Sequence, residues 1–443
     1  MKTFRAGGVH PPENKLSVES SIEVFPLPGQ VIIPVNQNLG APAIPLVSKG
    51  DYVKTGQLIA KGESFISSNV HSSVSGKVLK IDEMIDQTGF RRKAVVINVE
   101  GDEWEPSVDR STGLRREILL KREEIIKKIH EMGIVGMGGA TFPSHVKLMV
   151  PDDKKAEYLI INGVECEPYL TADHRLMLEK GEEVLIGTLI LMRGLGVDKA
   201  IIGIESNKPD AIRHMTQLAM PYPNISVQAL KVKYPQGGEK QLINALLGRE
   251  VPSGRLPIEV GCVVNNVGTA FAVYEAVQKN KPLIERIVTV TGTTVKKPSN
   301  YLVRIGTPVQ ELLEKARADL EITGKVVSGG PMMGKALNSL EVPVVKGTSG
   351  LLLFAEAKSS RNEIKACIRC GRCVRVCPMG LEPILIAQYS ENNLWDMAET
   401  NLVMDCMECG SCHYTCPSGR PLLDYIRLGK NKVGQNIRNR GKK

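Results

Sequence analysis

The sequence predicts a multidomain α/β protein with a helical, cysteine-rich C-terminal part. Three observations support this fold class. The chain has 443 residues, enough for about three domains at roughly 150 residues each. Its central part alternates glycine-rich turns, apolar strands and amphipathic helices, as α/β domains do. Eight of its ten cysteines fall between residues 367 and 416, which sets the C-terminal part apart from the rest.

The composition is that of an ordinary globular protein, with 42% hydrophobic and 24% charged residues. The longest apolar stretch, 184–192, is far shorter than the roughly 20 residues that a membrane-spanning helix needs. Residues 1–8 lack the apolar core of a secretion signal. We therefore expect a cytoplasmic protein without disulfide bonds.

The formal net charge of +9 is concentrated at the C-terminus. Residues 425–443 contain seven Lys and Arg and no acid, which leaves +2 for the rest of the chain. Such a segment suits nucleic acid, anionic lipid or an acidic partner, and equally a solvated, disordered terminus. We treat residues 431–443 as a basic tail and expect no nucleic-acid partner.

The N-terminal region, 1–112, predicts a β-sandwich. Segments 50–60 and 74–78 resemble the two half-barrels of biotinyl and lipoyl carrier domains. Carrier domains present a lysine at an exposed hairpin tip, but the corresponding tip here, 66–71, has none. The resemblance therefore implies a structural barrel-sandwich hybrid domain without a swinging arm.

A glycine loop marks the start of the central domain. An amphipathic helix is expected over 114–132, and the loop follows at 133–147, with the sequence GIVGMGGATFPSHVK. Clustered glycines let backbone amides approach an anion, and a helix starting at Pro143 adds its N-terminal dipole. The loop lacks the last glycine of the dinucleotide fingerprint and follows a helix rather than a strand, so a simple turn is the alternative.

Three later segments strengthen the anion-binding interpretation. A strand is expected at 158–162, followed by GVECEP at 163–168, and the other two segments are YPQGGE at 234–239 and NNVGT at 265–269. Together with the glycine loop they resemble the flavin- and NADH-binding subunit of respiratory complex I. The resemblance implies a Rossmann-like FMN- and NADH-binding domain over 113–284. It implies FMN contacts at Gly136, Gly138, Lys147, Asn162, Glu165, Tyr234, Asn265 and Asn266.

The same resemblance implies three residues next to the nicotinamide nucleotide, namely Phe142, Glu167 and Glu239. Two positions depart from the complex I pattern: Met137 replaces an arginine, and Val164 replaces an acidic residue of the flavin loop. Cys166 lies beside the expected flavin, where a packed free thiol is the simpler interpretation than a redox-active one.

Residues 285–355 predict a third, smaller domain. A β-strand is expected at 286–292 and a helix around 308–320. The segment resembles the soluble-ligand-binding β-grasp domain that follows the flavin domain in complex I. A ligand-binding role and a structural role as a spacer both fit, and we favour the spacer.

Two cysteine runs of identical spacing predict a ferredoxin domain over 356–430. Each reads C-x₂-C-x₂-C-x₃-C-P, the spacing that holds cubane iron–sulfur clusters and lends its fourth cysteine to the neighbouring cluster. This assigns one [4Fe–4S] cluster to Cys367, Cys370, Cys373 and Cys416, and the other to Cys377, Cys406, Cys409 and Cys412. Paired zinc sites are the alternative, but they use two C-x₂-C knuckles rather than three-cysteine runs closed by Cys-Pro.

The segment between the two runs, 381–404, predicts a helical connector. Its apolar residues recur at helical spacing, which places one face inward. The expected inner face comprises Ile384, Leu385, Ile386, Leu394 and Met397.

The order of these four regions is similar to the C subunits of Rnf complexes, which are membrane-bound, ion-translocating ferredoxin:NAD⁺ oxidoreductases. The resemblance implies a peripheral subunit on the cytoplasmic face of the membrane. It would pass electrons between NAD(H), FMN and two [4Fe–4S] clusters, in either direction. Integral membrane and ferredoxin-like subunits would be its partners and would couple electron flow to Na⁺ or H⁺ transport. Two alternatives stay open: a diaphorase subunit of a soluble hydrogenase-type complex, and a flavin-free relay or docking subunit.

Overall fold

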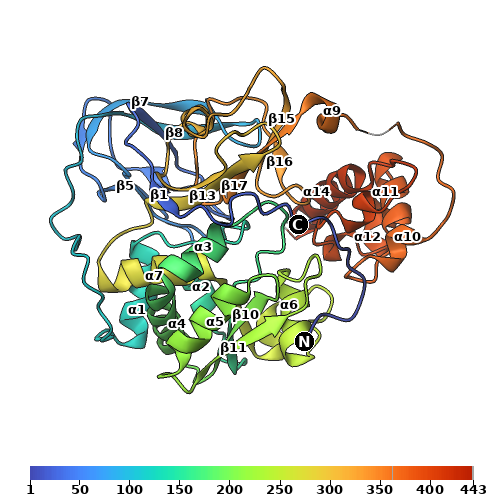
Figure 1. Cartoon of the computed structure of the whole chain (residues 1–443), viewed down its shortest axis with the longest axis horizontal. Helices are drawn as coiled ribbons and strands as arrows, with labels where there is room; N and C mark the ends of the chain where they lie inside the picture. The colour runs from blue at the N-terminus through green and yellow to red at the C-terminus, as the bar shows by residue number, and fades with distance from the viewer. Residues whose placement is uncertain (362, 442–443) are drawn as a thin grey trace.

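The computed structural model describes residues 1–361 and 363–441. Four parts with separate cores lie side by side in it (Figure 1). Two β-rich parts form the upper half of the view, the α/β part lies below them, and the helical C-terminal part lies at one side. Within the described residues, no helix has both the length and the apolar character needed to cross a bilayer.

The N-terminal part is a sandwich of two small sheets around an aliphatic core. The sheet orders are β2-β8-β7-β4 and β3-β5-β6. Alternation of buried and exposed residues along β7 is typical of a strand with one face on a core. The strands are β2 Gln30–Pro34, β3 Ile44–Pro45, β4 Tyr52–Val53, β5 Leu58–Lys61, β6 Val70–His71, β7 Gly76–Ile85 and β8 Arg91–Val99.

The first residues of the chain lie outside the two sheets of this sandwich. Strand β1 (Ile22–Val24) pairs in parallel with β14 of the third part. Upstream of it, Lys2 bridges to Leu230 and Val9 to Tyr234, so residues 1–17 run along the α/β part. We call residues 1–17 the N-terminal strap.

The central part is a four-stranded parallel sheet in the order β11-β10-β9-β12. Its strands are nearly continuous apolar runs, and separate clusters of buried residues cover its two faces. The strands are β9 Tyr158–Asn162, β10 Ala200–Glu205, β11 Ile225–Leu230 and β12 Cys262–Asn266. The helices are α1 Arg122–Glu131, α2 Ser144–Leu148, α3 Ala172–Glu179, α4 Gly181–Leu195, α5 Pro209–Ala219, α6 Glu239–Leu247 and α7 Val267–Gln278, with the 3₁₀ turn η1 Pro257–Val260.

Two expectations for this part are tested by its elements. The strand expected at 158–162 is confirmed as β9. The helix expected over 114–132 is wrong in its first turns, because α1 begins only at Arg122. Residues upstream of it are held in non-helical form by Gln278, whose side-chain amide donates to the carbonyls of Arg115 and Glu117.

The third part is a six-stranded mixed sheet in the order β1-β14-β13-β17-β15-β16, covered by α8. The helix expected around 308–320 is shorter, since α8 ends at Lys315. The elements are β13 Glu285–Gly292, β14 Ser299–Arg304, α8 Val309–Lys315, β15 Thr323–Ser328, β16 Lys335–Ala336 and β17 Gly350–Ala355.

The C-terminal part is a small helical domain reached through α9 (Glu356–Ser359). The expected connector over 381–404 is broken into two helices and a 3₁₀ turn. Ile386 is fully buried, but Leu394 and Met397 are 49% and 45% exposed, so the inner face was partly wrong. The elements are α10 Arg372–Arg375, α11 Pro383–Glu391, α12 Trp395–Thr400, η2 Val403–Asp405, α13 Ser411–Tyr414 and α14 Leu422–Arg440.

The expectation of a separate basic tail is also corrected. Helix α14 continues to Arg440, and it buries Leu422, Ile426 and Val433 at helical spacing against the domain core. Of the basic residues in this helix, Arg427, Lys430 and Lys432 lie between these apolar positions, and Arg438 and Arg440 lie beyond Val433. Of the expected tail, residues 442 and 443 lie outside the described part of the chain.

Candidate cofactor and electron-transfer site

The glycine loop closes over the carboxyl edge of the parallel sheet, where α/β domains bind their ligands. Its two ends pair, since Val135 bridges to Pro143 and the Gly136 amide donates to the Phe142 carbonyl at 2.8 Å. A Cβ at Gly138 would lie 3.6 Å from Asn266, at the end of β12. The loop is therefore a narrow hairpin with exposed glycines at its tip.

The structure shows how a positive charge is kept near the glycine loop although Met137 replaces the arginine of the complex I pattern. The Met137 side chain packs into the core, and the Arg286 guanidinium donates to its backbone carbonyl at 2.8 Å. Arg286 is buried, and desolvation lowers its pKa to about 10, so it stays charged at neutral pH. A positive charge thus lies beneath the glycine loop without an arginine in the loop itself.

Lys147 and Glu239 meet at the open side of the loop. The Lys147 ammonium lies 2.9 Å from a Glu239 carboxylate oxygen and also donates to the Val264 carbonyl at 2.9 Å. Both side chains are partly exposed. Such an exposed ion pair is worth at most about 1 kcal/mol, so a bound ligand can replace it at little cost.

The ends of β9 and β12 supply side-chain amides to the same edge. The Asn162 amide donates to the Gly237 carbonyl at 2.8 Å, and its oxygen accepts from the Val164 amide. Asn266 caps α7 through the Gly268 amide and donates to Asp173 at 2.7 Å. Asn162, Asn266 and the 237–239 turn are thereby brought together.

Three buried polar groups near this edge have no hydrogen-bond partner among the described residues. They are Asn265 Nδ2, Ser144 Oγ and Gln236 Nε2. An unpaired buried donor costs about 1–3 kcal/mol, so each is expected to pair with a ligand or water. The phosphate and ring carbonyls of a flavin are acceptors of the kind these donors require, so the residues present fit FMN.

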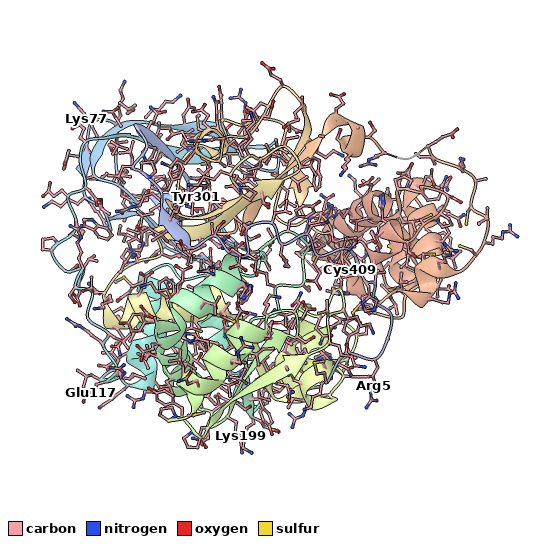
Figure 2. All side chains as sticks on the ribbon, in the orientation of Figure 1. Arg5, Lys77, Glu117, Lys199, Tyr301 and Cys409 are labelled. Carbon is pink, nitrogen blue, oxygen red and sulfur yellow. The ribbon has the colours of Figure 1, made fainter. Side chains whose placement is uncertain are left out.

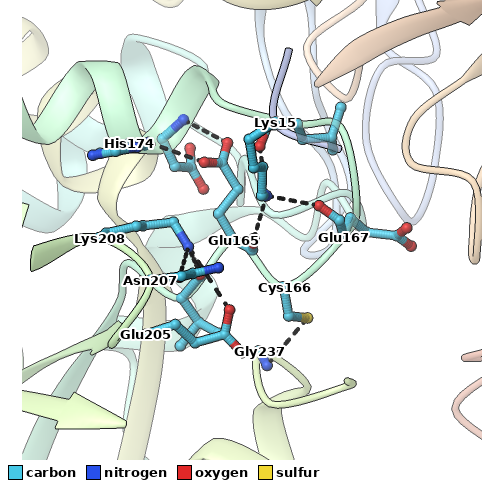
Figure 3. A network of polar contacts seen from close by, with 12 residues as sticks. Lys15, Glu165, Cys166, Glu167, His174, Glu205, Asn207, Lys208 and Gly237 are labelled. Carbon is cyan, nitrogen blue, oxygen red and sulfur yellow. Dashed lines mark hydrogen bonds and ion pairs between the residues drawn. The ribbon is translucent and has the colours of Figure 1, made fainter. Parts of the chain in front are cut away.

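Two lysines hold the loop that follows β9, and sequence reasoning missed both. The Lys15 ammonium, from the N-terminal strap, donates to the carbonyls of Glu165, Glu167 and Leu170 at 3.0, 2.9 and 2.7 Å (Figure 3). Desolvation lowers the pKa of Lys15. On the other side, the buried Lys208 donates to the Val164 carbonyl at 2.7 Å.

The side chains of Glu165 and Cys166 both accept hydrogen bonds from backbone amides. The Glu165 carboxylate accepts from the amides of Asp173 and His174 at the start of α3 and so orders the loop. The Cys166 sulfur accepts from the Gly237 amide at 3.4 Å, and burial raises the pKa of this thiol. A thiol kept protonated in this way is unreactive, as expected for a packed cysteine.

Glu167 makes contacts with the third domain. Its carboxylate accepts from the amides of Met332 and Met333 in the third domain at 3.0 and 2.8 Å, and it lies 3.4 Å from the Tyr234 hydroxyl oxygen. Burial raises the pKa of Glu167 to about 7. The structure therefore places Glu167 at a junction between domains; Phe142 lies within the glycine loop, and Glu239 pairs with Lys147 at the end of that loop.

Four of the cluster cysteines line one buried cavity, together with apolar side chains such as Ile386 and Leu423. They come from both runs, as the crossed ligation predicts: Cys377, Cys406, Cys409 and Cys412. Within the described residues, no three potential ligands are close enough to share a single metal ion. The cavity between four thiols in an apolar surrounding fits a cubane cluster.

The other four cysteines lie nearer the surface. Cys367 and Cys370 are exposed, and Cys373 and Cys416 are partly exposed. We call these four the outer set and the cavity-lining four the inner set.

The inner set lies against the flavin-site elements. The Tyr234 hydroxyl donates to the Cys409 carbonyl at 2.8 Å. Gly238 and Gly7 pack so closely on this domain that an added Cβ would lie 2.5 Å from Met407 and 2.5 Å from the Cys377 backbone. Figure 2 shows Cys409 where the helical domain meets the rest of the chain.

Comparison with known proteins assigns a family to each part. The matched families are an RnfC barrel sandwich hybrid domain at 2–102, the Nuo51 FMN-binding domain at 129–275, an SLBB domain at 287–336 and a 4Fe-4S dicluster domain at 360–417. Three relatives are similar over most of their length. The C subunit of the proton-translocating ferredoxin:NAD(+) oxidoreductase complex of Clostridium ljungdahlii is 48% identical over 97% of this chain and 94% of its own. The corresponding Na(+)-translocating protein of Acetobacterium woodii is 46% identical over 97% of both chains. The C subunit of the ion-translocating oxidoreductase complex of Rhodobacter capsulatus is 42% identical over 90% of this chain and 77% of its own.

The chain belongs to the RnfC family. The fold class expected from the sequence is confirmed, with a barrel-sandwich hybrid, an FMN-binding α/β domain, a β-grasp domain and a dicluster domain. The cofactors of this RnfC-family chain are FMN and two [4Fe–4S] clusters, and NAD(H) fits as substrate.

Solved structures share the fold at low sequence identity. The NAD⁺-reducing [NiFe]-hydrogenase in its H₂-reduced state matches with a TM-score of 0.50 and 20% identity, over 71% of this chain and 63% of that one. Its air-oxidised state gives a TM-score of 0.51 and 19% identity. This likeness extends to fold alone, whereas the RnfC relatives match nearly the whole chain.

Proposed function

We propose that this RnfC-family chain is the peripheral NADH-, FMN- and iron–sulfur-binding subunit of a membrane-bound ferredoxin:NAD⁺ oxidoreductase. It passes electrons between NAD(H), FMN and two [4Fe–4S] clusters on the cytoplasmic face of the membrane. Integral membrane and ferredoxin-like partner subunits couple this flow to Na⁺ or H⁺ translocation. The observation that carries the proposal is the contact of Tyr234 with Cys409, which joins the candidate flavin site to the inner cysteine set.

FMN is assigned to the carboxyl edge of the sheet. When bound, it exchanges a hydride with NAD(H) and single electrons with the clusters. The proposed FMN contacts are Gly136, Gly138, Lys147, Asn162, Glu165, Tyr234, Asn265 and Asn266. Lys147 supports this role because its ammonium is held beside the loop by the exchangeable Glu239 carboxylate, and the unpaired Asn265 amide supports it by needing an acceptor.

The nucleotide is assigned to the open side of the glycine loop. Phe142 and Glu239 border that side, and Glu239 is the better supported of the two because its carboxylate is partly exposed. Glu167 is assigned there only by the resemblance. Its contacts to Met332 and Met333 support a second role, in fixing the third domain against the flavin loop.

The clusters are proposed to act in a fixed order. Cys377, Cys406, Cys409 and Cys412 hold the cluster next to FMN, in the apolar cavity that keeps water away from it. Cys367, Cys370, Cys373 and Cys416 hold the second cluster, nearer the surface. Electrons thus pass between FMN and a partner through the buried cluster first.

An anaerobic spectrum tests the proposal. Iron and acid-released flavin are quantified in the isolated chain, and the absorbance is followed before and after NADH. We expect FMN, two cubanes' worth of iron, and bleaching of both chromophores by NADH. Iron without flavin and without bleaching would instead make the chain a relay or docking protein.

A matched pair of variants assigns the nucleotide site. Glu239→Gln is expected to lose NADH bleaching while its iron and flavin contents stay unchanged. Glu250→Gln, an exposed glutamate of the same domain, serves as the control and should bleach normally. Full bleaching of Glu239→Gln by NADH contradicts the assignment.

A further inference from the structure

The two cysteine runs share a spacing but differ in exposure and charge. The first run lies in a stretch, 357–381, that contains six Lys and Arg and a single acid, Glu363. The second run lies in 402–420, which contains Asp405 and Glu408 and only one Arg. The first cysteines of the outer set, Cys367 and Cys370, are exposed, whereas Cys409 and Cys412 of the inner set are buried. The two copies of the motif therefore lie in surroundings that differ in exposure and charge.

Three arginines stand between the cysteines of the first run. Arg369, Arg372 and Arg375 are all exposed, and none of them forms an ion pair with another described residue. The ion pairs of this domain involve other arginines, as in Arg361–Asp424 and Arg420–Glu391. Three exposed arginines without an ion-pair partner among the described residues thus alternate with the cysteines of the first run.

Exposed apolar side chains accompany this charge. Ile364 and Ile368 are 55% and 68% exposed, and Val374 is also exposed. The segment leading into α10 forms the outer edge of the helical domain, on the side away from the α/β domain (Figure 1). We call residues 364–375 the outer face.

We infer that the outer face docks an acidic electron-transfer protein whose own redox centre lies near its surface. The inference rests on the proposed function and names the partner that exchanges electrons with the outer cluster. Unpaired arginines steer an acidic partner by long-range attraction. Ile364 and Ile368 then supply a small apolar contact, which brings the two redox centres together at the exposed Cys367 and Cys370.

Charge alone would suit any polyanion, but the position of the cysteines selects among them. An anionic membrane or a nucleic acid has no electron to exchange with a cluster at Cys367 and Cys370. Transient electron-transfer complexes are small and rely on charge for association. The combination of basic charge, two isoleucines and exposed cluster ligands therefore favours a protein carrier.

The test compares two triple variants of the full chain with its clusters in place. Arg369→Gln/Arg372→Gln/Arg375→Gln alters the outer face. Lys77→Gln/Arg91→Gln/Lys93→Gln removes the same charge from exposed strands of the N-terminal sandwich. The probe is an acidic two-[4Fe–4S] bacterial ferredoxin. Calorimetry measures binding of the oxidised probe, and stopped flow measures electron exchange with the reduced probe.

At an ionic strength of about 0.01–0.05 M, where screening is weak, the arginine variant is expected to lose about tenfold or more in association rate. Its rate should also become less dependent on salt, while the sandwich control variant keeps wild-type behaviour. Ile368→Gln, which keeps all charges, is expected to weaken binding without changing the salt dependence. Iron content is compared in every variant.

Four outcomes overturn the inference: an equal loss in both triple variants, no loss in the arginine variant, unchanged binding in Ile368→Gln, or arginine-dependent binding to phosphatidylglycerol vesicles instead of ferredoxin. The proposed function fails separately. If NADH does not bleach the wild-type chain but ferredoxin binding depends on the arginines, the docking face stands and the nucleotide route does not.

Discussion

Lys15→Met is the most direct test of how the flavin loop is held. The methionine keeps an unbranched side chain of similar length and removes three hydrogen bonds to the carbonyls of Glu165, Glu167 and Leu170. Those carbonyls belong to the loop that carries the proposed flavin contact at Glu165. We expect the variant to fold, because the strap keeps its backbone pairing at Lys2 and Val9, but to bind FMN weakly.

The magnitude follows from the three contacts. A hydrogen bond to a charged group contributes about 1.5–3 kcal/mol, and the cost of desolvating one ammonium offsets part of the sum. We therefore expect the free energy that orders the loop to fall by about 3 kcal/mol, because three carbonyls lose their donor. If the ordered loop is required for binding, this loss raises the dissociation constant of FMN about 150-fold, at about 1.4 kcal/mol per factor of ten.

The assay titrates FMN into the flavin-depleted chain and follows the quenching of flavin fluorescence. Lys2→Met is the matched control, since its ammonium makes one hydrogen bond in the same strap, to the Leu246 carbonyl, away from the flavin loop. Its FMN affinity should stay near that of the wild type. A Lys15→Met chain with intact iron content and an FMN dissociation constant within about twofold of the wild-type value would refute the reasoning.

Three further substitutions test the contact between the flavin site and the clusters, the crossed cluster ligation, and the buried Lys346. Tyr234→Phe removes the hydrogen bond to Cys409, worth about 1 kcal/mol. It should slow electron transfer from FMN to the clusters in single-turnover absorbance traces more than it slows FMN reduction by NADH, and equal slowing of both steps would contradict this. Cys377→Ala, although in the first run, should lose the inner cluster, or roughly half of the iron, as measured by iron analysis and electron paramagnetic resonance; loss of the outer signal instead would disprove the crossed ligation. Burial lowers the pKa of Lys346 to about 7, so between that value and its ordinary 10.5 the unfolded chain binds more protons and stability rises with pH. Lys346→Met should flatten this rise in apparent melting temperature, and an unchanged slope would exclude Lys346 as its source.

The sequence was most informative where a motif is local. Both cysteine runs and strand β9 depend on residues close in the chain, so the local sequence alone predicted them. The prediction that Cys377 binds a cluster together with cysteines of the second run follows from the same spacing, and it agrees with the cavity that these cysteines line. These features needed no knowledge of how the domains pack.

Residues that act across the chain were not predictable in the same way. Lys15 contacts carbonyls 150 to 155 residues away, and the Tyr234 hydroxyl reaches a carbonyl 175 residues away. Nothing in the local pattern around either side chain specifies such a partner, because a backbone carbonyl has no sequence signature. The apolar face of 381–404 failed for a related reason. Leu394 and Met397 match helical spacing, but the break between α11 and α12 turns them away from the core.

At the hairpin tip of the N-terminal sandwich, a lysine from a distant part of the chain lies where the tip itself has none. Its hairpin tip lacks the lysine of a carrier domain, and the lysine found there comes from the third domain. The buried Lys346 ammonium donates to the Asn69 carbonyl at the tip at 2.8 Å and to the Gly133 carbonyl at 2.7 Å. Gly133 opens the glycine loop, so one ammonium ties three domains at the base of the flavin site. A swinging arm needs a free tip, whereas this tip is enclosed, and the domain that resembles a carrier is better understood as the support on which the glycine loop is fixed.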